Sequence, residues 1–151
     1  MIETWRSVEG SDGYEVSDLG RVRSYRGRGC STRLRAEPNI LTPVIRGGYP
    51  QVRLTRARTM SVHTLVLEAF VGLASPGLEC RHLNGNPLDG RLDNLRWGTK
   101  SENYADRRGH GTSNDGERHG NAIIDNVTAR AIYAADGDCI EIAKRFGVTT
   151  T

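Results

Sequence analysis

Three polar side chains in the middle of the chain have the types and the spacing that phosphodiester hydrolysis requires. They are His82, Asn94 and Asn103. Cleavage needs an activated water, stabilisation of the charge that develops on the phosphate and a protonated leaving oxygen. An imidazole titrates near neutral pH and suits a general base, whereas an amide oxygen suits a hard cation. We predict that His82 activates the water, that Asn94 fixes a loop and that Asn103 binds one divalent cation, Mg²⁺ or Mn²⁺.

The expected local structure places these side chains on one small motif. Residues 78–82 and 95–97 are typical of two short strands, and an irregular loop with glycines and a proline joins them. Thr99 and Glu102 match a capping box, which predicts a helix that Gly109 ends. Each polar residue alone is typical of an ordinary turn or cap. Their joint order favours the strand, loop, strand and helix of a ββα-metal site.

The N-terminal residues alternate between apolar and polar side chains in a way that predicts β-hairpins. Val16 and Val22 flank turn residues and are expected to face inward, so that Arg21 and Arg23 share the opposite face. Residues 26–39 are rich in arginine and glycine, which predicts a loop.

Positive charge is concentrated towards the N-terminus. Residues 1–60 contain 11 arginines against 6 acidic residues, whereas residues 61–110 are balanced and residues 111–151 are net acidic. The planar guanidinium suits phosphates and guanine edges, although an arginine-bearing face is also typical of ordinary solvated surface. We predict that the partner is double-stranded DNA. The arginines expected to contact it are Arg21, Arg23, Arg53, Arg56 and Arg58.

Residues 62–71 repeat apolar side chains at the spacing of one helical face, and His63 lies just beside that stripe. We expect His63 either to support the site or to pack beneath it. Further along, the composition of residues 109–122 is typical of a linker. Residues 123–151 predict a partial helix-turn-helix, truncated where its second helix is expected to begin near Thr149.

The bulk composition excludes several classes of protein. No apolar run is long enough to cross a membrane, and the N-terminus lacks the regions of a signal peptide. The cysteines, Cys30, Cys80 and Cys139, include no C-x-x-C pair, so we expect neither a disulfide framework nor a structural zinc site. A cytoplasmic, reducing location follows as the default, with the protein a monomer or a homodimer.

Three blocks of the sequence occur in a distinctive combination. They are Trp5-Arg6 with Gly13–Ser24, Val62–Gly72, and His82–Leu88 through Asn94–Thr99 to Glu102-Asn103. In this combination the chain resembles phage-type HNH homing endonucleases that carry an N-terminal NUMOD4 module. The resemblance implies an α+β fold, with antiparallel β-hairpins, then a ββα-metal (His-Me finger) HNH core, then a short helical tail.

The resemblance also implies an organisation and an activity. Residues 1–47 correspond to the NUMOD4-like DNA-binding module and residues 48–108 to the HNH nuclease domain. The implied activity is metal-dependent cleavage of DNA strands, in which His82 is the general base, Asn94 the central loop-fixing asparagine and Asn103 a metal ligand.

Two positions depart from the family pattern. Arg81 stands just before the general base, where such nucleases place a metal-binding acid or histidine, and an arginine is suited instead to clamping a phosphate. Asn84 stands where many relatives have an aspartate, so it is a weaker candidate metal ligand, and Asp89 or Asp93 could restore the carboxylate. These departures leave open a catalytically weakened or inactive DNA-binding protein derived from an HNH nuclease. An RNA-binding or RNA-cutting protein is a third class that basic hairpins permit.

Overall fold

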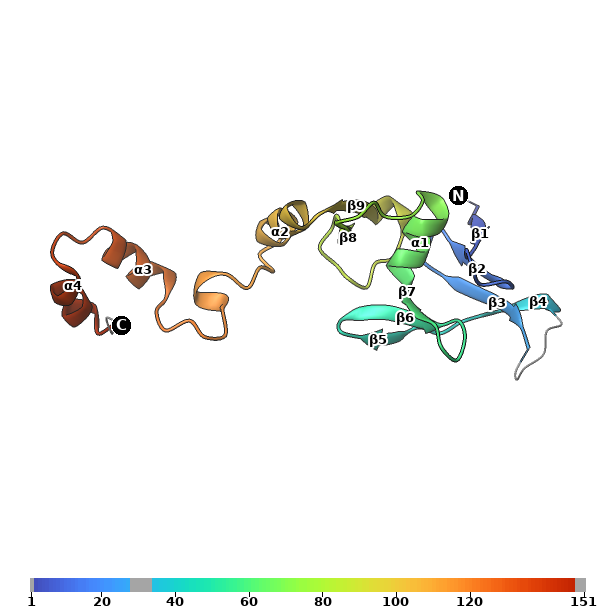
Figure 1. The fold of residues 1–151 in the computed structure, drawn as a ribbon, viewed down its shortest axis with the longest axis horizontal. Helices are drawn as coiled ribbons and strands as arrows, with labels where there is room; N and C mark the ends of the chain where they lie inside the picture. The colour runs from blue at the N-terminus through green and yellow to red at the C-terminus, as the bar shows by residue number, and fades with distance from the viewer. Residues whose placement is uncertain (1, 28–33, 149–151) are drawn as a thin grey trace. The chain divides into compact units, whose positions relative to one another are not determined.

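The computed structural model describes residues 2–27 and 34–148. The chain forms two units, Met1–Gly111 and Thr112–Thr151, and each is considered by itself. The first unit contains three antiparallel sheets with helices α1 and α2 (Figure 1). The second contains short helices only among its described residues. The predicted α+β fold, with hairpins followed by a strand-pair-and-helix core and a helical tail, is confirmed.

The first sheet is a four-stranded antiparallel meander. Its strands, in spatial order, are β1 (Trp5–Ser7), β2 (Tyr14–Ser17), β3 (Val22–Arg26) and β4 (Leu34–Ile40). Val16 pairs with Val22 across β2 and β3, and both side chains are buried, as the alternation predicted. The loop predicted over residues 26–39 is wrong for residues 34–39, because they belong to β4, an edge strand that pairs with β3; residues 28–33 lie outside the described part.

The second sheet leads directly into the helix that carries His63. Its strands are β5 (Val44–Arg46), β6 (Tyr49–Arg53) and β7 (Thr59–Ser61). Gly47 and Gly48 make the two-residue β5–β6 turn with φ of 58° and 85°, a left-handed backbone that glycine adopts without steric cost. Helix α1 (Val62–Phe70) starts immediately after β7, so His63 is the second residue of the helix.

The third sheet and the following helix form the predicted motif. Strands β8 (Leu78–His82) and β9 (Leu95–Thr99) are antiparallel, and a 3-10 turn, η1 (Leu92–Asn94), precedes β9. Helix α2 (Lys100–Gly109) then begins with the complete capping box, in which the Thr99 side chain accepts from the Glu102 N–H and the Glu102 carboxylate accepts from the Thr99 N–H.

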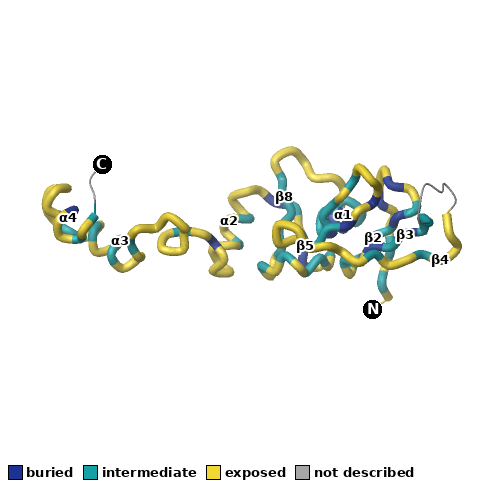
Figure 2. Tube along the Cα trace, turned by 90° about the horizontal axis from the view of Figure 1, so that it is seen from below, coloured by how far each residue is buried: buried dark blue, intermediate teal, exposed yellow. Residues whose placement is uncertain are grey.

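A single hydrophobic core joins these elements. Its centre is α1, which contacts β1, β2, β6, β7, β8 and β9, and the buried parts of the chain gather along α1, β2 and β3 (Figure 2). The buried side chains come from all three sheets and from α1, and they include Val16, Val22, Val52, Val62, Leu65, Val66, Leu67 and Leu95. The N-terminal hairpins and the strand-pair motif therefore share one core, across the module boundary predicted near residue 47.

The second unit has η2 (Gly116–Arg118), α3 (Asn126–Tyr133) and α4 (Cys139–Phe146). Asp125 and Asp138 cap α3 and α4 through their side chains, and Gly147 ends α4 at φ 64°. The second helix predicted to begin near Thr149 lies outside the described residues. None of the helices within residues 2–27 and 34–148 has the length and apolarity that a membrane span needs.

Candidate active site

Strand β8 places His82 at its last position. His82 pairs with Leu95, the first residue of β9. Immediately after β8, the Leu83 N–H donates to the Asn94 carbonyl at 2.9 Å. Because successive side chains of a strand point to opposite faces, Cys80 and His82 share one face of β8, and Glu79 and Arg81 share the other. The two faces meet different helices, since His82 lies against His63 of α1 while Arg81 contacts α2.

Asn94 spans the loop between the two strands. Its amide oxygen accepts from the Asn84 N–H at 2.9 Å, and its amide nitrogen donates to the Asp89 carbonyl at 2.9 Å. The side chain is buried, with 6% exposure, so both bonds are shielded from water. Asn94 therefore holds the loop in one shape directly beside His82.

The His82 imidazole is half-buried and neutral. Its ring packs edge-on against the His63 ring at a centroid distance of 5.1 Å, and the Tyr49 ring lies near both imidazoles. Burial lowers the pKa of His82, while the negative charge of Asp89 opposes that shift. The Nε2 atom of His82 is buried and has no hydrogen-bond partner within the described residues. The lowered pKa favours the uncharged imidazole, and no described residue occupies its Nε2 atom.

His63 is a close neighbour of His82 that shares its neutral state. Burial, and then the proximity of His82, lower the pKa of His63 to about 4. Its Nδ1 atom is also buried and lacks a hydrogen-bond partner among the residues that the structure describes. The position of the ring beside His82 fits a support for the site, one of the two roles expected from the sequence.

Arg81 is held by helix α2. Its guanidinium donates to both carboxylate oxygens of Asp106, at 2.8 and 3.0 Å, and lies 3.1 Å from the carboxylate of Glu102. The Arg81 side chain is only 17% exposed, and its hydrogen bonds lower the pKa of Asp106. A phosphate would have to compete with two carboxylates for this guanidinium, so the clamp suggested by the sequence stays a prediction.

Asn103 projects from α2 towards Glu79 on β8. The Asn103 amide nitrogen lies 3.3 Å from a Glu79 carboxylate oxygen, and Lys100 lies 3.9 Å from the other oxygen. A 180° rotation of the amide brings its oxygen to the same place, which pairs two oxygen donors of the kind that hard cations prefer. These donors fit a divalent cation. The sequence analysis missed Glu79. Its two-residue spacing from Arg81 places both side chains on the face of β8 that contacts α2, called here the α2 face; Cys80 and His82 lie on the opposite, α1 face.

The carboxamide of Asn84 is used inside the loop. Its nitrogen donates to the Asp89 carboxylate at 2.8 Å, and its oxygen accepts from the Asn86 N–H at 2.8 Å. Asp89 also pairs with Arg91 at 3.0 Å, and this contact is the main cause of the lowered pKa of Asp89. The Asp93 carboxylate, 77% exposed, lies 3.9 Å from Arg91. A metal role for Asn84 remains a prediction.

Most of the arginines expected to contact DNA have partners within the protein. Arg21 pairs with Glu3, and Arg23 donates to Glu15 at 2.6 Å while its guanidinium lies 4.2 Å from the Trp5 ring centroid. In the second hairpin, the Arg53 side chain donates to the backbone carbonyls of Thr55 and Arg56. Arg58 donates to the carbonyls of Glu9 and Gly10, and the Arg56 residue is exposed. Their predicted DNA contacts remain predictions.

Two protein families match consecutive parts of the chain. Residues 3–55 match the NUMOD4 motif, and residues 61–105 match the HNH endonuclease family. The HNH match contains His63, His82, Asn94 and Asn103.

Individual relatives agree with both matches. The chain is 27% identical over 137 residues to the DNA endonuclease I-HmuI of Bacillus phage SP01, which covers 88% of this chain and 74% of the relative. It is 34% identical over 109 residues to the uncharacterized HNH endonuclease L247 of Acanthamoeba polyphaga mimivirus, which covers 67% of this chain and only 25% of that protein.

A solved structure shows the same fold. The structure concerns DNA binding and cleavage by the HNH homing endonuclease I-HmuI, and it matches with a TM-score of 0.59 at 27% identity. The match covers 74% of this chain and 62% of that chain. With a NUMOD4 motif followed by an HNH core, the chain belongs to the HNH endonucleases of the homing type.

Proposed function

We propose that this protein hydrolyses phosphodiester bonds of double-stranded DNA with one divalent cation and with His82 as the general base. The observation that carries the proposal is the neutral His82 imidazole at the end of β8, whose buried Nε2 has no hydrogen-bond partner among the described residues. A general base needs its lone pair free and its pKa low enough to be unprotonated at neutral pH. The lowered pKa of His82 and its unpartnered Nε2 support both requirements.

The neighbouring side chains prepare His82 for this role. Asn94 fixes the loop through its bonds to the backbone of Asn84 and Asp89, which keeps the end of β8 in one conformation. His63 packs edge-on against the His82 ring and restricts its rotation. His82 then takes the proton from a water that attacks phosphorus, and this proton transfer is the step that the chain itself supplies.

Asn103 and Glu79 are the residues that would hold the cation. Their amide and carboxylate groups are 3.3 Å apart, close to the separation of about 3 Å between adjacent oxygens around Mg²⁺. A cation bound there would stabilise the charge that builds up on the phosphate. Asp106 and Glu102 neutralise Arg81, which limits its repulsion of a cation near Asn103.

The relatives support the proposed partner and setting. The I-HmuI structure concerns binding and cleavage of DNA, and the excess of arginine in residues 1–60 suits a phosphate backbone. Because I-HmuI belongs to a phage, we place the protein in the cytoplasm of a bacterial host.

A plasmid-nicking assay with Mg²⁺ or Mn²⁺ tests this function. We expect metal-dependent cleavage by the wild type, and a loss of about 10²- to 10⁴-fold in His82→Ala, which removes the base. His119→Ala is the matched control, because His119 is an exposed histidine of the second unit. Metal-dependent cleavage that is equally fast in His82→Ala contradicts the role of His82.

A second candidate function is DNA binding with weak or no cleavage. The observation that favours it is the ion-paired Arg81, at the position where related nucleases place a metal ligand. In that case the wild type shifts DNA in a gel but does not cut it with any divalent metal. Arg81→Asp would then gain metal-dependent cleavage, whereas no gain would contradict the idea that Arg81 is the cause.

A further inference from the structure

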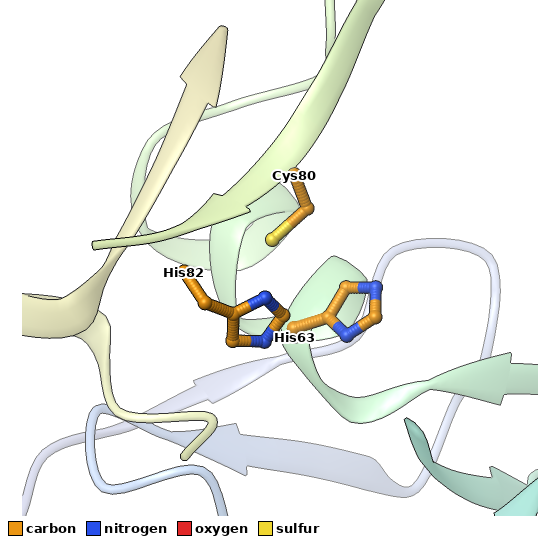
Figure 3. Close-up of side chains that lie close together, drawn as sticks. All are labelled: His63, Cys80 and His82. Atoms are coloured by element: carbon orange, nitrogen blue, oxygen red, sulfur yellow. The ribbon is translucent and has the colours of Figure 1, made fainter. Parts of the chain in front are cut away.

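A cluster of three soft donor groups lies on the α1 face of β8. Cys80 and His82 point from β8 towards His63 of α1, and Figure 3 shows the three side chains converging. One ligand atom from each residue lies within 4.8 Å of the other two. The HNH mechanism proposed above uses His82 alone as a base and gives the Cys80 thiol no role.

Two nitrogen atoms of this cluster have no hydrogen-bond partner among the described residues. Nδ1 of His63 and Nε2 of His82 are buried without a hydrogen bond to any described residue. The Cys80 sulfur lies 3.9 Å from the backbone carbonyl of Arg81, a long contact. Buried polar atoms normally have hydrogen-bond partners, so two such nitrogens beside one thiol call for an explanation.

The dimensions of the cluster are close to those of a tetrahedral metal site. With Zn–S of about 2.3 Å and Zn–N of about 2.0 Å, ligand atoms around zinc are about 3.3–3.6 Å apart. The cluster has to contract by about 1.5 Å at most, which small side-chain rotations provide. His63 also lines a cavity of about 110 Å³ with Pro50, Pro87 and Leu88, which gives the ring an approach from outside the core.

Metal binding at this cluster requires the thiol to lose its proton, whereas the two imidazoles need lose none. Both imidazoles are held neutral by burial, which is the form that binds metals. Burial raises the pKa of the Cys80 thiol to about 12, so the free protein carries the S–H form. Metal binding forms a metal–sulfur bond and releases the thiol proton to solvent.

We propose that His63, Cys80 and His82 form a three-ligand site for a thiophilic transition metal, with zinc as its natural ligand and a fourth position open to water. One sulfur and two imidazoles select zinc or cobalt over Mg²⁺, which prefers oxygen. The site lies on the opposite face of β8 from Asn103 and Glu79. A metal there occupies the lone pair of His82, so zinc inhibits cleavage; this consequence, unlike the binding, rests on the proposed function.

Cobalt is the probe for the binding, because a Co²⁺–thiolate bond gives a charge-transfer absorption band in the near ultraviolet. We expect the full-length protein to develop this band at one equivalent of Co²⁺ and to lose it when Zn²⁺ is added. Cys80→Ser removes the band, while Cys139→Ser, which alters the exposed cysteine of α4, keeps it. A band that persists in Cys80→Ser, or no band in the wild type, overturns the proposal.

His63→Gln gives a reading that does not depend on the fold of a cysteine variant. It keeps the thiol and removes one nitrogen ligand, so Co²⁺ affinity falls about 10-fold or more while the thiolate band survives at saturation. Wild-type Co²⁺ affinity in His63→Gln contradicts the three-ligand site. Circular dichroism on both variants verifies that the protein is folded during the titration.

The activity experiment separates this proposal from the proposed function. Mg²⁺-dependent cleavage is measured at buffered free Zn²⁺, and each variant is compared with its own zinc-free rate. We expect zinc to inhibit the wild type at about 10-fold or more lower free concentration than it inhibits Cys80→Ser. Absence of any cleavage contradicts the proposed function but leaves the Co²⁺ result intact. Cleavage without Co²⁺–thiolate binding contradicts the site alone.

Discussion

The two faces of β8 use opposite kinds of chemistry although they alternate residue by residue along five positions. The α1 face carries Cys80, which packs against the core, and His82, which lies against His63; burial favours the uncharged form of both. The α2 face carries Glu79 and Arg81, which are charged and paired with polar groups of α2. The strand therefore places an uncharged histidine and a cluster of charges on opposite faces.

The largest effect is expected on the rate of cleavage at low pH, which depends on His82 of the α1 face. His82 must be neutral to accept a proton, so the rate falls about tenfold for each pH unit below the pKa of His82. Burial lowers that pKa, and the acid limb should therefore have its midpoint below the ordinary value of about 6.5. A pH–rate profile of plasmid cleavage measures the midpoint.

Asp89→Asn tests whether His82 is the group that controls the acid limb of this profile. The negative charge of Asp89 raises the pKa of His82, in opposition to burial, so its removal should move the acid limb to still lower pH. A limb that moves to higher pH would mean that a group other than His82 controls the rate.

The next largest effect is expected on the free energy of unfolding at low pH, to which His63 contributes from beside the α1 face. The pKa of His63 is about 4 in the folded protein and about 6.5 when unfolded, so the unfolded chain binds more protons between these values. The contribution of His63 is complete above pH 6.5 and is lost as the pH falls towards 4. It amounts to about 2 kcal/mol after allowance for the partial exposure of the ring.

His63→Gln should remove this contribution to the pH dependence. Urea unfolding of the wild type and the variant between pH 4 and 7 gives the two slopes, and the slope of the variant should be the shallower. Equal slopes would show that His63 is already solvated in the folded protein. His119→Gln, an exposed histidine, is the control that should leave the slope unchanged.

Local sequence signals predicted the strands and the helix that carry the site, because each signal acts within a few residues. The capping box Thr99–Glu102 predicted the start of α2, and the glycines and the proline between two short strands predicted the irregular loop that joins β8 and β9. His82 and Asn103 consequently lie on the strand and the helix where the sequence predicted them.

Contacts between distant segments could not be predicted in the same way. His63 and Cys80 meet only because α1 packs against β8, and Arg81 finds Asp106 only because α2 folds back over that strand. Strand β4 was missed for a related reason, since Pro38 and its charged neighbours lower strand propensity while pairing with β3 decides the structure.

A smaller effect is expected on the α2 face from Gly98→Ala. A Cβ at Gly98 would overlap Cδ of Arg81, so the arginine stem has to move and its ion pairs are disturbed. We expect a loss of about 1–2 kcal/mol in unfolding free energy. Gly109→Ala, with open space around its Cβ at the end of α2, is the matched control and should not destabilise the protein. Equal stability of the two variants would show that Arg81 adjusts freely.

The smallest effect on stability is expected from Asp106→Asn. The two faces of β8 differ in the pH range in which their contributions to stability are lost. Arg81 lowers the pKa of Asp106 below its ordinary value of about 3.8, so this pair contributes stability above that pH and loses it as the pH falls further. The α1 face loses its contribution between 6.5 and 4, whereas the α2 face loses its contribution below about 3.8. Because both side chains are partly exposed, the substitution should cost about 1 kcal/mol or less, and the cost should shrink in high salt. Urea unfolding at pH 7 in low and high salt measures this cost. If Asp106→Asn lowered the free energy of unfolding by more than Gly98→Ala does, and independently of salt, the α2 face would be as shielded from solvent as the α1 face.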